Sequence, residues 1–168
     1  MSQVKAFHLL HGIVLTTVLR NDQPTLRLVE TDKKNAWAAY ILNDSVIIYV
    51  KYCLTSRETQ REAKTVWNFQ FQGYELEKIK ELRKFKPVNF TLVGGFQKIE
   101  DANKMQVCLM YPDEIDKCID IYSGNIQTIT MEVKPSESLR VYGAKNSTEK
   151  EKLVISRNRL NEWKIPGS

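Results

Sequence analysis

The sequence predicts an α+β fold in which one domain, residues 1–168, combines an N-terminal helix and two further helices with a mixed or mostly antiparallel sheet. Apolar residues make up 42% of the chain, enough for one sizeable core. Segments with helical periodicity are separated by groups of short β-branched and aromatic runs, and that order favours α+β. Aromatic residues at 10% exclude a disordered chain, and the low glycine and proline counts exclude a collagen-like one.

The first helix is predicted from a run of apolar residues at spacings of three and four, which share one helical face. That run is Val4, Phe7, His11, Val14 and Val18. Gly12 lies inside it and costs a helix about 1 kcal/mol, so we expect close packing against a sheet at this point. The polar residues 21–24 end the helix.

Three strands are expected next. Thr25–Thr31 forms the first, with Glu30 at its end, and residues 32–35 form a turn. Trp37–Leu42 forms the second. Ser45–Tyr52 is a nearly continuous β-branched and aromatic run, which indicates an interior strand buried on both faces.

The middle of the chain predicts a strand and the best internal helix. Thr55–Lys64 is polar and basic and is expected to be a loop or a short helical turn. Val66–Phe71 alternates strictly and indicates a half-buried strand. Gly73–Lys86 has acidic residues in its first turn and basic residues in its last, as a helix dipole favours. Its apolar residues recur every third position: Leu76, Ile79, Leu82 and Phe85.

The second half predicts more strands and one short helix. The helix begins at Pro112 and ends at Gly124, and its inner face is expected to carry Ile115, Cys118, Ile119 and Tyr122. The strands are Val88–Val93, Met105–Met110, Gln127–Val133, Leu139–Tyr142 and Leu153–Ser156.

The charge and the cysteine content limit the possible functions and the cellular compartment. The net charge of +5 fits binding to nucleic acid or to an acidic partner, and it also fits a merely solvated surface. Cys53, Cys108 and Cys118 have no C-x-x-C spacing, so neither a disulfide framework nor a zinc site is expected. Free cysteines suit a reducing compartment. With no export signal and no apolar run long enough to span a bilayer, we expect a cytoplasmic protein.

A constellation in the first half carries the most specific chemistry. Glu30 closes the first strand, Asp44 precedes the third, and Lys51 lies near the end of the third. These residues lie in a segment where a helix and three strands are followed later by a second helix and a strand. The arrangement resembles the restriction-endonuclease-like nuclease superfamily over about Val4–Val93.

The resemblance implies a chemistry and a set of roles. Glu30 and Asp44 would hold Mg²⁺, and the metal would activate water and stabilise a phosphate. Lys51 would orient that water and offset developing charge. Tyr49 stands where the superfamily has its second carboxylate. In a working site, the strands of Glu30 and Lys51 would have to be neighbours. Asp44 lies seven positions before Lys51, and this odd spacing puts the two side chains on opposite faces of a regular strand. Asp44 would therefore have to lie in a turn or beside a bulge.

A second resemblance concerns the fold alone. The segments 11–15, 48–52, 67–71 and 92–95 resemble those of small bacterial or phage α+β proteins, and this likeness implies no activity.

Other residues have both a binding and a structural interpretation. Arg57, Arg61 and Lys64 would share a face if their segment were helical, and could then contact a phosphate backbone. The strand carrying Trp67, Phe69 and Phe71 could stack bases but lacks interleaved cations, so core packing is favoured. His8 and His11, at i and i+3, lack a third ligand for a metal site.

The sequence thus leaves several functions open. The leading one is a nucleic-acid-associated domain with a nuclease-like fold, binding DNA or RNA, catalytically degenerate or Mg²⁺-dependent. The alternative is a non-enzymatic protein-interaction module, such as a phage or host-defence accessory protein. A metal-independent hydrolase using His8 or His11 has no support beyond the presence of those residues.

Overall fold

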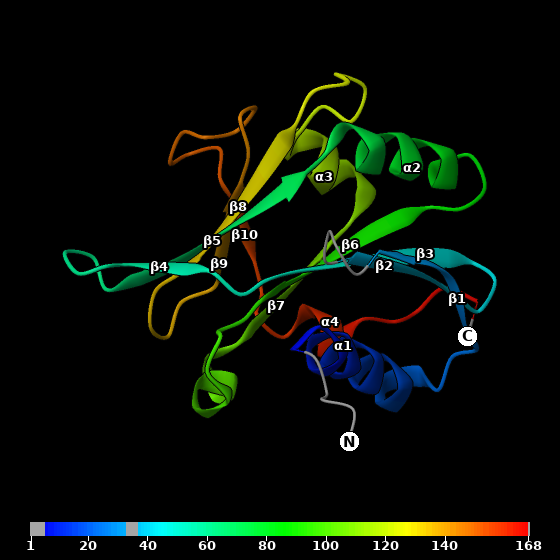
Figure 1. Ribbon diagram of the computed structural model, residues 1–168, viewed down its shortest axis with the longest axis horizontal. Helices are drawn as coiled ribbons and strands as arrows, with labels where there is room; N and C mark the ends of the chain where they lie inside the picture. The colour runs from blue at the N-terminus through cyan, green and yellow to red at the C-terminus, as the bar shows by residue number, and fades with distance from the viewer. Residues whose placement is uncertain (1–5, 33–36, 168) are drawn as a thin grey trace.

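The structure, a computed structural model, describes residues 6–32 and 37–167, and Figure 1 shows two sheets with helices packed around them. The helices are α1 (Ala6–Asp22), α2 (Gly73–Arg83), α3 (Pro112–Cys118) and α4 (Arg159–Glu162), with a 3-10 turn η1 at Ile99–Lys104. The strands are β1 (Leu26–Asp32), β2 (Trp37–Leu42), β3 (Val46–Cys53), β4 (Ser56–Thr59), β5 (Lys64–Phe71), β6 (Val88–Gly94), β7 (Gln106–Met110), β8 (Gln127–Val133), β9 (Leu139–Tyr142) and β10 (Leu153–Ile155). Val4 and residues 33–35 of the expected turn lie outside the described residues.

The strands divide between two five-stranded sheets, with the orders β1-β2-β3-β6-β7 and β10-β9-β8-β5-β4. Every strand pair is antiparallel except β3 with β6. The predicted α+β fold is therefore confirmed, although the expected sheet is split in two. The expectation that the first and third strands are neighbours is wrong, because β2 lies between β1 and β3.

The interior position predicted for Ser45–Tyr52 is confirmed by β3, which has β2 on one side and β6 on the other. All six residues from Val46 to Lys51 are buried. Ile48 and Val50 belong to the core beneath α1, whereas Ile47 and Tyr49 belong to the core between the two sheets. The first sheet is thus covered on both faces, which is why its central strand shows no polar alternation.

One face of the first sheet is covered by α1 and by the C-terminal segment (Figure 1). Leu10, Val14 and Val18 are almost completely buried there, as the helical spacing predicted. Gly12 does not pack as expected, since a Cβ atom at this position would have no neighbour within 4 Å. The glycine lies on the outer side of α1 instead.

The other face packs against the second sheet, α2 and α3. Trp67, Phe69 and Phe71 of β5 are at most 1% exposed and form part of this core, which confirms the packing interpretation and leaves no ring face for a base. The indole Nε1 of Trp67 donates to the carbonyl of Gly95 at 3.0 Å. A Cβ on Gly94 would stand 2.6 Å from the Trp67 ring, so glycine permits this close contact between the sheets.

Two loop regions differ from their predictions. The segment Thr55–Lys64 is a turn only at residues 60–63, because Ser56–Thr59 pairs with β5 as an edge strand of a hairpin. Polar and charged residues are typical of an edge strand. Helix α3 ends at Cys118, since Ile119 is extended and the Asp120 carboxylate accepts a hydrogen bond from the backbone N–H of Tyr122.

The positions at which α3 and α2 end explain why two aromatic side chains are exposed. Tyr122 lies beyond the end of α3 and is 73% exposed, instead of packing on the inner face of the helix. Gly124, with φ of +73°, serves the loop instead of capping α3. Helix α2 likewise ends at Arg83, which leaves Phe85 outside its apolar stripe and 79% exposed.

Among the described residues, no helix combines the length and apolar character needed to span a bilayer.

Candidate functional site

The most unusual polar group in the fold is a buried cluster formed by Tyr49, Lys51 and Glu75. Tyr49 and Lys51 are two residues apart on β3 and point to the face that packs against α2, because side chains alternate along a strand. The Lys51 ammonium lies 2.6 Å from Oε1 of Glu75, and the Tyr49 hydroxyl donates to the same oxygen at 2.8 Å. Lys51 is 6% exposed and Glu75 is fully buried.

The first turn of α2 places the Glu75 carboxylate. Its second oxygen, Oε2, accepts the backbone N–H of Gln72 at 2.9 Å, as in a capping box. The apolar residues Leu76 and Ile79 hold this side of α2 against the core. Glu75 therefore accepts three hydrogen bonds, and its charge is balanced by Lys51 and by the helix N-terminus.

Aromatic rings enclose the cluster. Tyr49 stacks on Trp37 with ring centroids 4.9 Å apart, and the Lys51 ammonium lies 4.8 Å from the centroid of the Phe71 ring. Burial lowers the pKa of Lys51, an effect that the Glu75 carboxylate partly offsets. Burial, together with Glu75, raises the pKa of Tyr49 far above its ordinary value, so Tyr49 remains a donor. The cluster is a satisfied ion pair that presents almost no surface to a substrate.

The structure does not bring together the three residues proposed for catalysis. Glu30 lies two strands from Tyr49 in the register of the first sheet, and its carboxylate pairs with Lys78 of α2 at 2.5 Å. Asp44 lies in the turn before β3, where its side chain is 81% exposed and 3.8 Å from Lys86. Asp44 is seven positions before Lys51, and β3 itself covers the five steps from Val46 to Lys51, about 17 Å at the usual rise. No bulge interrupts the pairing of β3 with β2 over this stretch.

Two acidic residues that sequence reasoning missed lie nearer to Lys51. One is Glu75 itself, which the sequence presented only as a first-turn acid of a helix. The other is Asp32, which is aligned with Trp37 and, through it, with Lys51 across the sheet, and whose negative charge acts to raise the pKa of Lys51. Asp32 is two positions beyond Glu30, and this spacing on one strand was the available signal.

These positions do not make a metal centre in the part of the chain that the structure describes. No group of three or more His, Cys, Asp or Glu side chains there has the geometry to hold an ion. Mg²⁺ needs oxygen ligands in near-octahedral geometry, and Glu75 already bonds to three donors. The residues present therefore do not fit the metal site that the nuclease resemblance implies.

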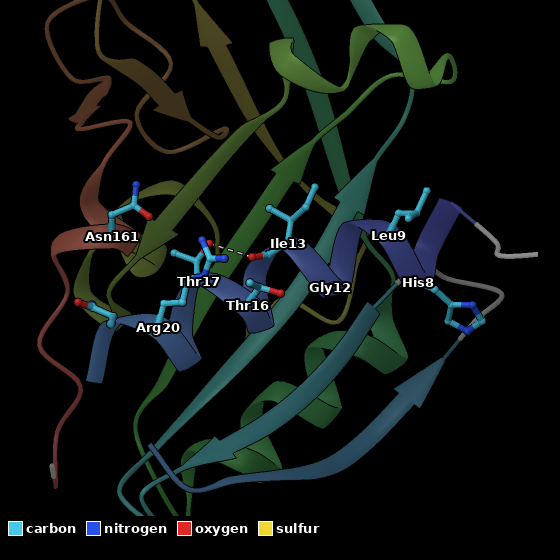
Figure 2. Close-up of a pocket in the computed structure, with 9 residues that line it drawn as sticks. His8, Leu9, Gly12, Ile13, Thr16, Thr17, Arg20 and Asn161 are labelled. Carbon is cyan, nitrogen blue, oxygen red and sulfur yellow. Dashed lines mark hydrogen bonds between the residues drawn. The ribbon is translucent and has the colours of Figure 1, made fainter. Parts of the chain in front are cut away.

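The histidines of α1 have separate environments. His11 is buried between Tyr40 and Tyr52, with ring centroids 6.5 and 5.8 Å away. Burial, with a smaller contribution from His8, lowers the pKa of His11 to about 4. His8 lines an open hollow of about 700 Å³ on the outside of α1, shown in Figure 2 together with Leu9, Ile13 and Asn161.

The basic residues predicted to bind nucleic acid lie on the β4–β5 hairpin, which projects from the body of the molecule (Figure 1). Arg57 and Arg61 are exposed. Lys64 is instead held at 2.9 Å by Glu62 and at 3.4 Å by Glu132, so it is largely neutralised. The hairpin thus offers two cations rather than three.

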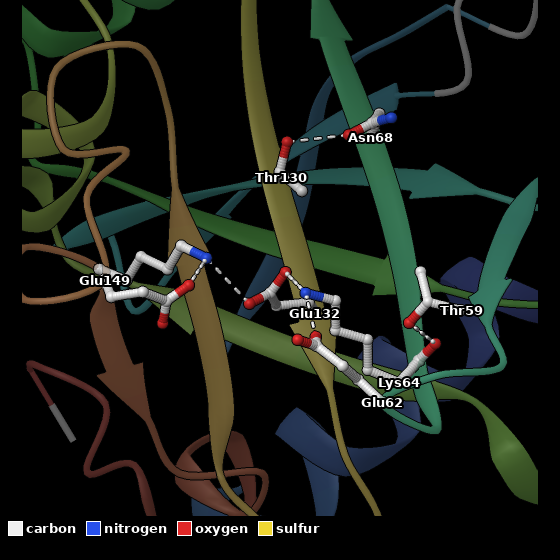
Figure 3. Close-up of polar contacts among 8 residues, drawn as sticks. Thr59, Glu62, Lys64, Asn68, Thr130, Glu132 and Glu149 are labelled. Carbon is white, nitrogen blue, oxygen red and sulfur yellow. Dashed lines mark hydrogen bonds and ion pairs between the residues drawn. The ribbon is translucent and has the colours of Figure 1, made fainter.

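Lys64 belongs to a chain of charges on the outer face of the second sheet, shown in Figure 3. Glu132 is its centre, because one carboxylate oxygen faces Lys64 and the other faces Lys152 at 3.1 Å. Lys152 also pairs with Glu149 at 2.6 Å and lies 4.4 Å from the centroid of the Tyr142 ring. Three carboxylates offset two ammonium groups, so the network is better explained as stabilising the fold than as binding a ligand.

Replacing Glu132 by alanine is expected to lower the free energy of unfolding by about 3 kcal/mol, because two lysines lose their shared buried partner. Urea denaturation of wild type and variant measures this difference. The matched control is Glu149→Ala, since Glu149 is 79% exposed and its ion pair should contribute little to stability. Equal losses in the two variants would show that Glu132 is not the centre of the network.

Comparisons with known proteins identify no relative. No family model matches the chain, and neither the curated proteins nor the solved structures provide a match. The function is therefore inferred from the chain's own residues.

Proposed function

We propose that this protein is a nucleic-acid-binding domain built on a nuclease-like scaffold whose cleavage chemistry is degenerate. The observation that carries the proposal is the position of Lys51 at the end of β3, beside Tyr49 and bound by a carboxylate from α2. The order of elements supports it, because α1, three strands, α2 and then a strand parallel to β3 follow one another, with the β4–β5 hairpin inserted before α2.

The degenerate chemistry follows from the same cluster. A catalytic lysine would need its ammonium free to face a water molecule or a phosphate, and that of Lys51 is bound to buried Glu75. Glu30 and Asp44 are engaged with Lys78 and Lys86 elsewhere on the surface. The ion pair thus retains a structural role where the resemblance implies a catalytic one.

The β4–β5 hairpin supplies the expected contact with a phosphate backbone. Arg57 and Arg61 make no ion pair among the residues that the structure describes, so both guanidinium groups are available to phosphate oxygens. The net charge of +5 adds a long-range attraction for a polyanion.

We expect micromolar binding to labelled DNA or RNA at about 50 mM salt, weakening steeply as salt rises. In an anisotropy titration, the Arg57→Ala/Arg61→Ala variant should reduce the slope of log affinity against log salt by about 2, one for each lost phosphate contact. The control, Arg20→Ala/Arg27→Ala, removes two exposed arginines from α1 and β1 and should keep the wild-type slope. Equal slopes in both double variants would exclude the hairpin, and no binding by wild type would exclude the function.

A protein-interaction module is the second candidate, and the outer face of α1 favours it. Leu9, Ile13 and Leu19 are 48%, 37% and 42% exposed there. Leu9 and Ile13 also line a second, mostly apolar hollow of about 220 Å³ with Phe96 and Met105. Absence of binding to any nucleic acid in the titration above would favour this candidate over the first.

A further inference from the structure

Two exposed aromatic rings flank the basic C-terminal half of α2. Phe85, just beyond the helix, is 79% exposed, and Tyr122, in the loop between α3 and β8, is 73% exposed. Rings of this size are normally among the more buried side chains. Neither ring is needed to cover the core, so both are accessible to a partner.

The rings are joined by two adjoining hollows. One, of about 440 Å³, is lined by Tyr122 with Lys80, Arg83 and Lys84. The other, of about 350 Å³, is lined by Phe85 with Arg83 and Lys86. Because Arg83 lines both hollows, the surface runs continuously from one ring to the other.

The charge of this surface favours a polyanion. Its lining contains four cations and two carboxylates, Glu77 and Glu81. Arg83 is fixed by Asp116 at 2.8 Å, which leaves three lysines as the adjustable cations.

The adjustable cations can exchange their partners for phosphate. Lys84 has no ion pair among the described residues. Lys80 pairs with exposed Glu77, and Lys86 stands 3.8 Å from exposed Asp44. Exposed pairs of this kind contribute little to stability, so a phosphate can replace the carboxylate.

A cation already lies beside one of the rings. The Lys80 ammonium is 5.6 Å from the centroid of the Tyr122 ring. Proteins that bind single strands combine such rings, on which bases stack, with cations that follow the backbone. A duplex offers its backbone but not its base faces, so exposed rings are of use only with an unpaired strand.

We propose that this α2 surface binds single-stranded nucleic acid, with bases stacked on Tyr122 and Phe85 and phosphates at Lys80, Lys84 and Lys86. The proposal rests on the proposed function and adds the kind of strand and a second contact surface. The β4–β5 hairpin lies at the opposite end of the molecule from the C-terminal end of α2 (Figure 1), so the two surfaces can be altered separately.

Anisotropy titrations with a labelled single strand of about 12 nucleotides and a hairpin duplex test the proposal, because one single-strand module covers about 4–16 nucleotides. Tyr122→Ala and Phe85→Ala should each weaken single-strand binding by about five- to a hundredfold and leave duplex binding unchanged. Tyr122→Phe retains the ring and should bind as wild type does. Both rings are exposed, and an unchanged thermal melt confirms that each variant is folded.

The outcomes separate the two proposals. The proposed single-strand site on α2 would be overturned in either of two cases: wild type binds the duplex but not the single strand, or the alanine variants bind the single strand as wild type does. Either result would leave the proposed function standing and would favour a protein partner for the two rings. Wild type that binds neither probe would overturn the proposed function itself.

Discussion

Replacing Glu75 by alanine is expected to lower the free energy of unfolding by about 3–5 kcal/mol, because it leaves the buried Lys51 ammonium without its partner. The same change removes the acceptor of the Tyr49 hydroxyl and of the Gln72 backbone N–H. A domain is typically stable by about 5–15 kcal/mol, so the loss is a large fraction of the whole. Urea denaturation monitored by tryptophan fluorescence measures it.

Three further variants isolate the buried pair. Glu77→Ala is the matched control on α2, since Glu77 is 60% exposed and its loss should cost about 0.5 kcal/mol or less. Glu75→Gln keeps an acceptor and provides a measurable protein if the alanine variant does not fold. Lys51→Met added to Glu75→Ala should recover stability, because no unpaired charge is then buried. A Glu75→Ala variant as stable as Glu77→Ala would refute the buried pair.

Acidification is expected to remove up to about 3 kcal/mol of stability through His11 alone. The pKa of His11 is lowered from 6.5 to about 4 in the folded chain, and a pKa difference of one between the folded and unfolded states corresponds to about 1.4 kcal/mol. As the pH falls below 6.5, the unfolded chain takes up the proton first, so stability is lost between about pH 6.5 and pH 4. Above pH 6.5 both states are neutral at His11 and the contribution is complete.

Urea denaturation at about pH 7 and about pH 4.5, the two sides of this interval, measures the loss. Carboxylates also titrate here, so the informative quantity is the difference between wild type and His11→Phe. The variant should lose less stability on acidification than wild type, because it has no imidazole to charge between Tyr40 and Tyr52. His8→Gln should lose nearly as much stability as wild type, because His8 makes only the smaller contribution to the lowered pKa of His11. Identical losses in wild type and His11→Phe would show that His11 is not the titrating group.

Local patterns predicted the elements of this fold well. The unbroken apolar run of β3 indicated its interior position, and the alternation of Trp67, Phe69 and Phe71 indicated which face of β5 is buried. The pairing of strands was harder to predict from the sequence. Strand β5 pairs with β8 across more than fifty residues of chain, and no local pattern encodes such a contact. The strand at Ser56–Thr59 was missed since an edge strand carries little apolar alternation.

The candidate site was predicted only in part. Lys51 was identified from its place at the end of a strand, but its partner was not, because an acidic residue in the first turn of a helix is explained equally well by the helix dipole. Only the packing of α2 on β3 turns Glu75 inward. Asp44 lies in the turn before β3 and Lys51 lies near the other end of that strand, and their odd spacing already conflicted with a shared site.

Incubating the protein with a labelled strand at a salt concentration where it is bound, with Mg²⁺ present, tests the proposed function most directly. The proposed function predicts that the strand is bound, and the engagement of Lys51 by Glu75 predicts that it stays intact. It also predicts that Asp44→Ala, a change at an exposed turn, does not weaken binding and leaves the strand intact. Cleavage that requires Mg²⁺ and is lost in Asp44→Ala or Lys51→Ala would contradict a degenerate scaffold and make the protein an active nuclease.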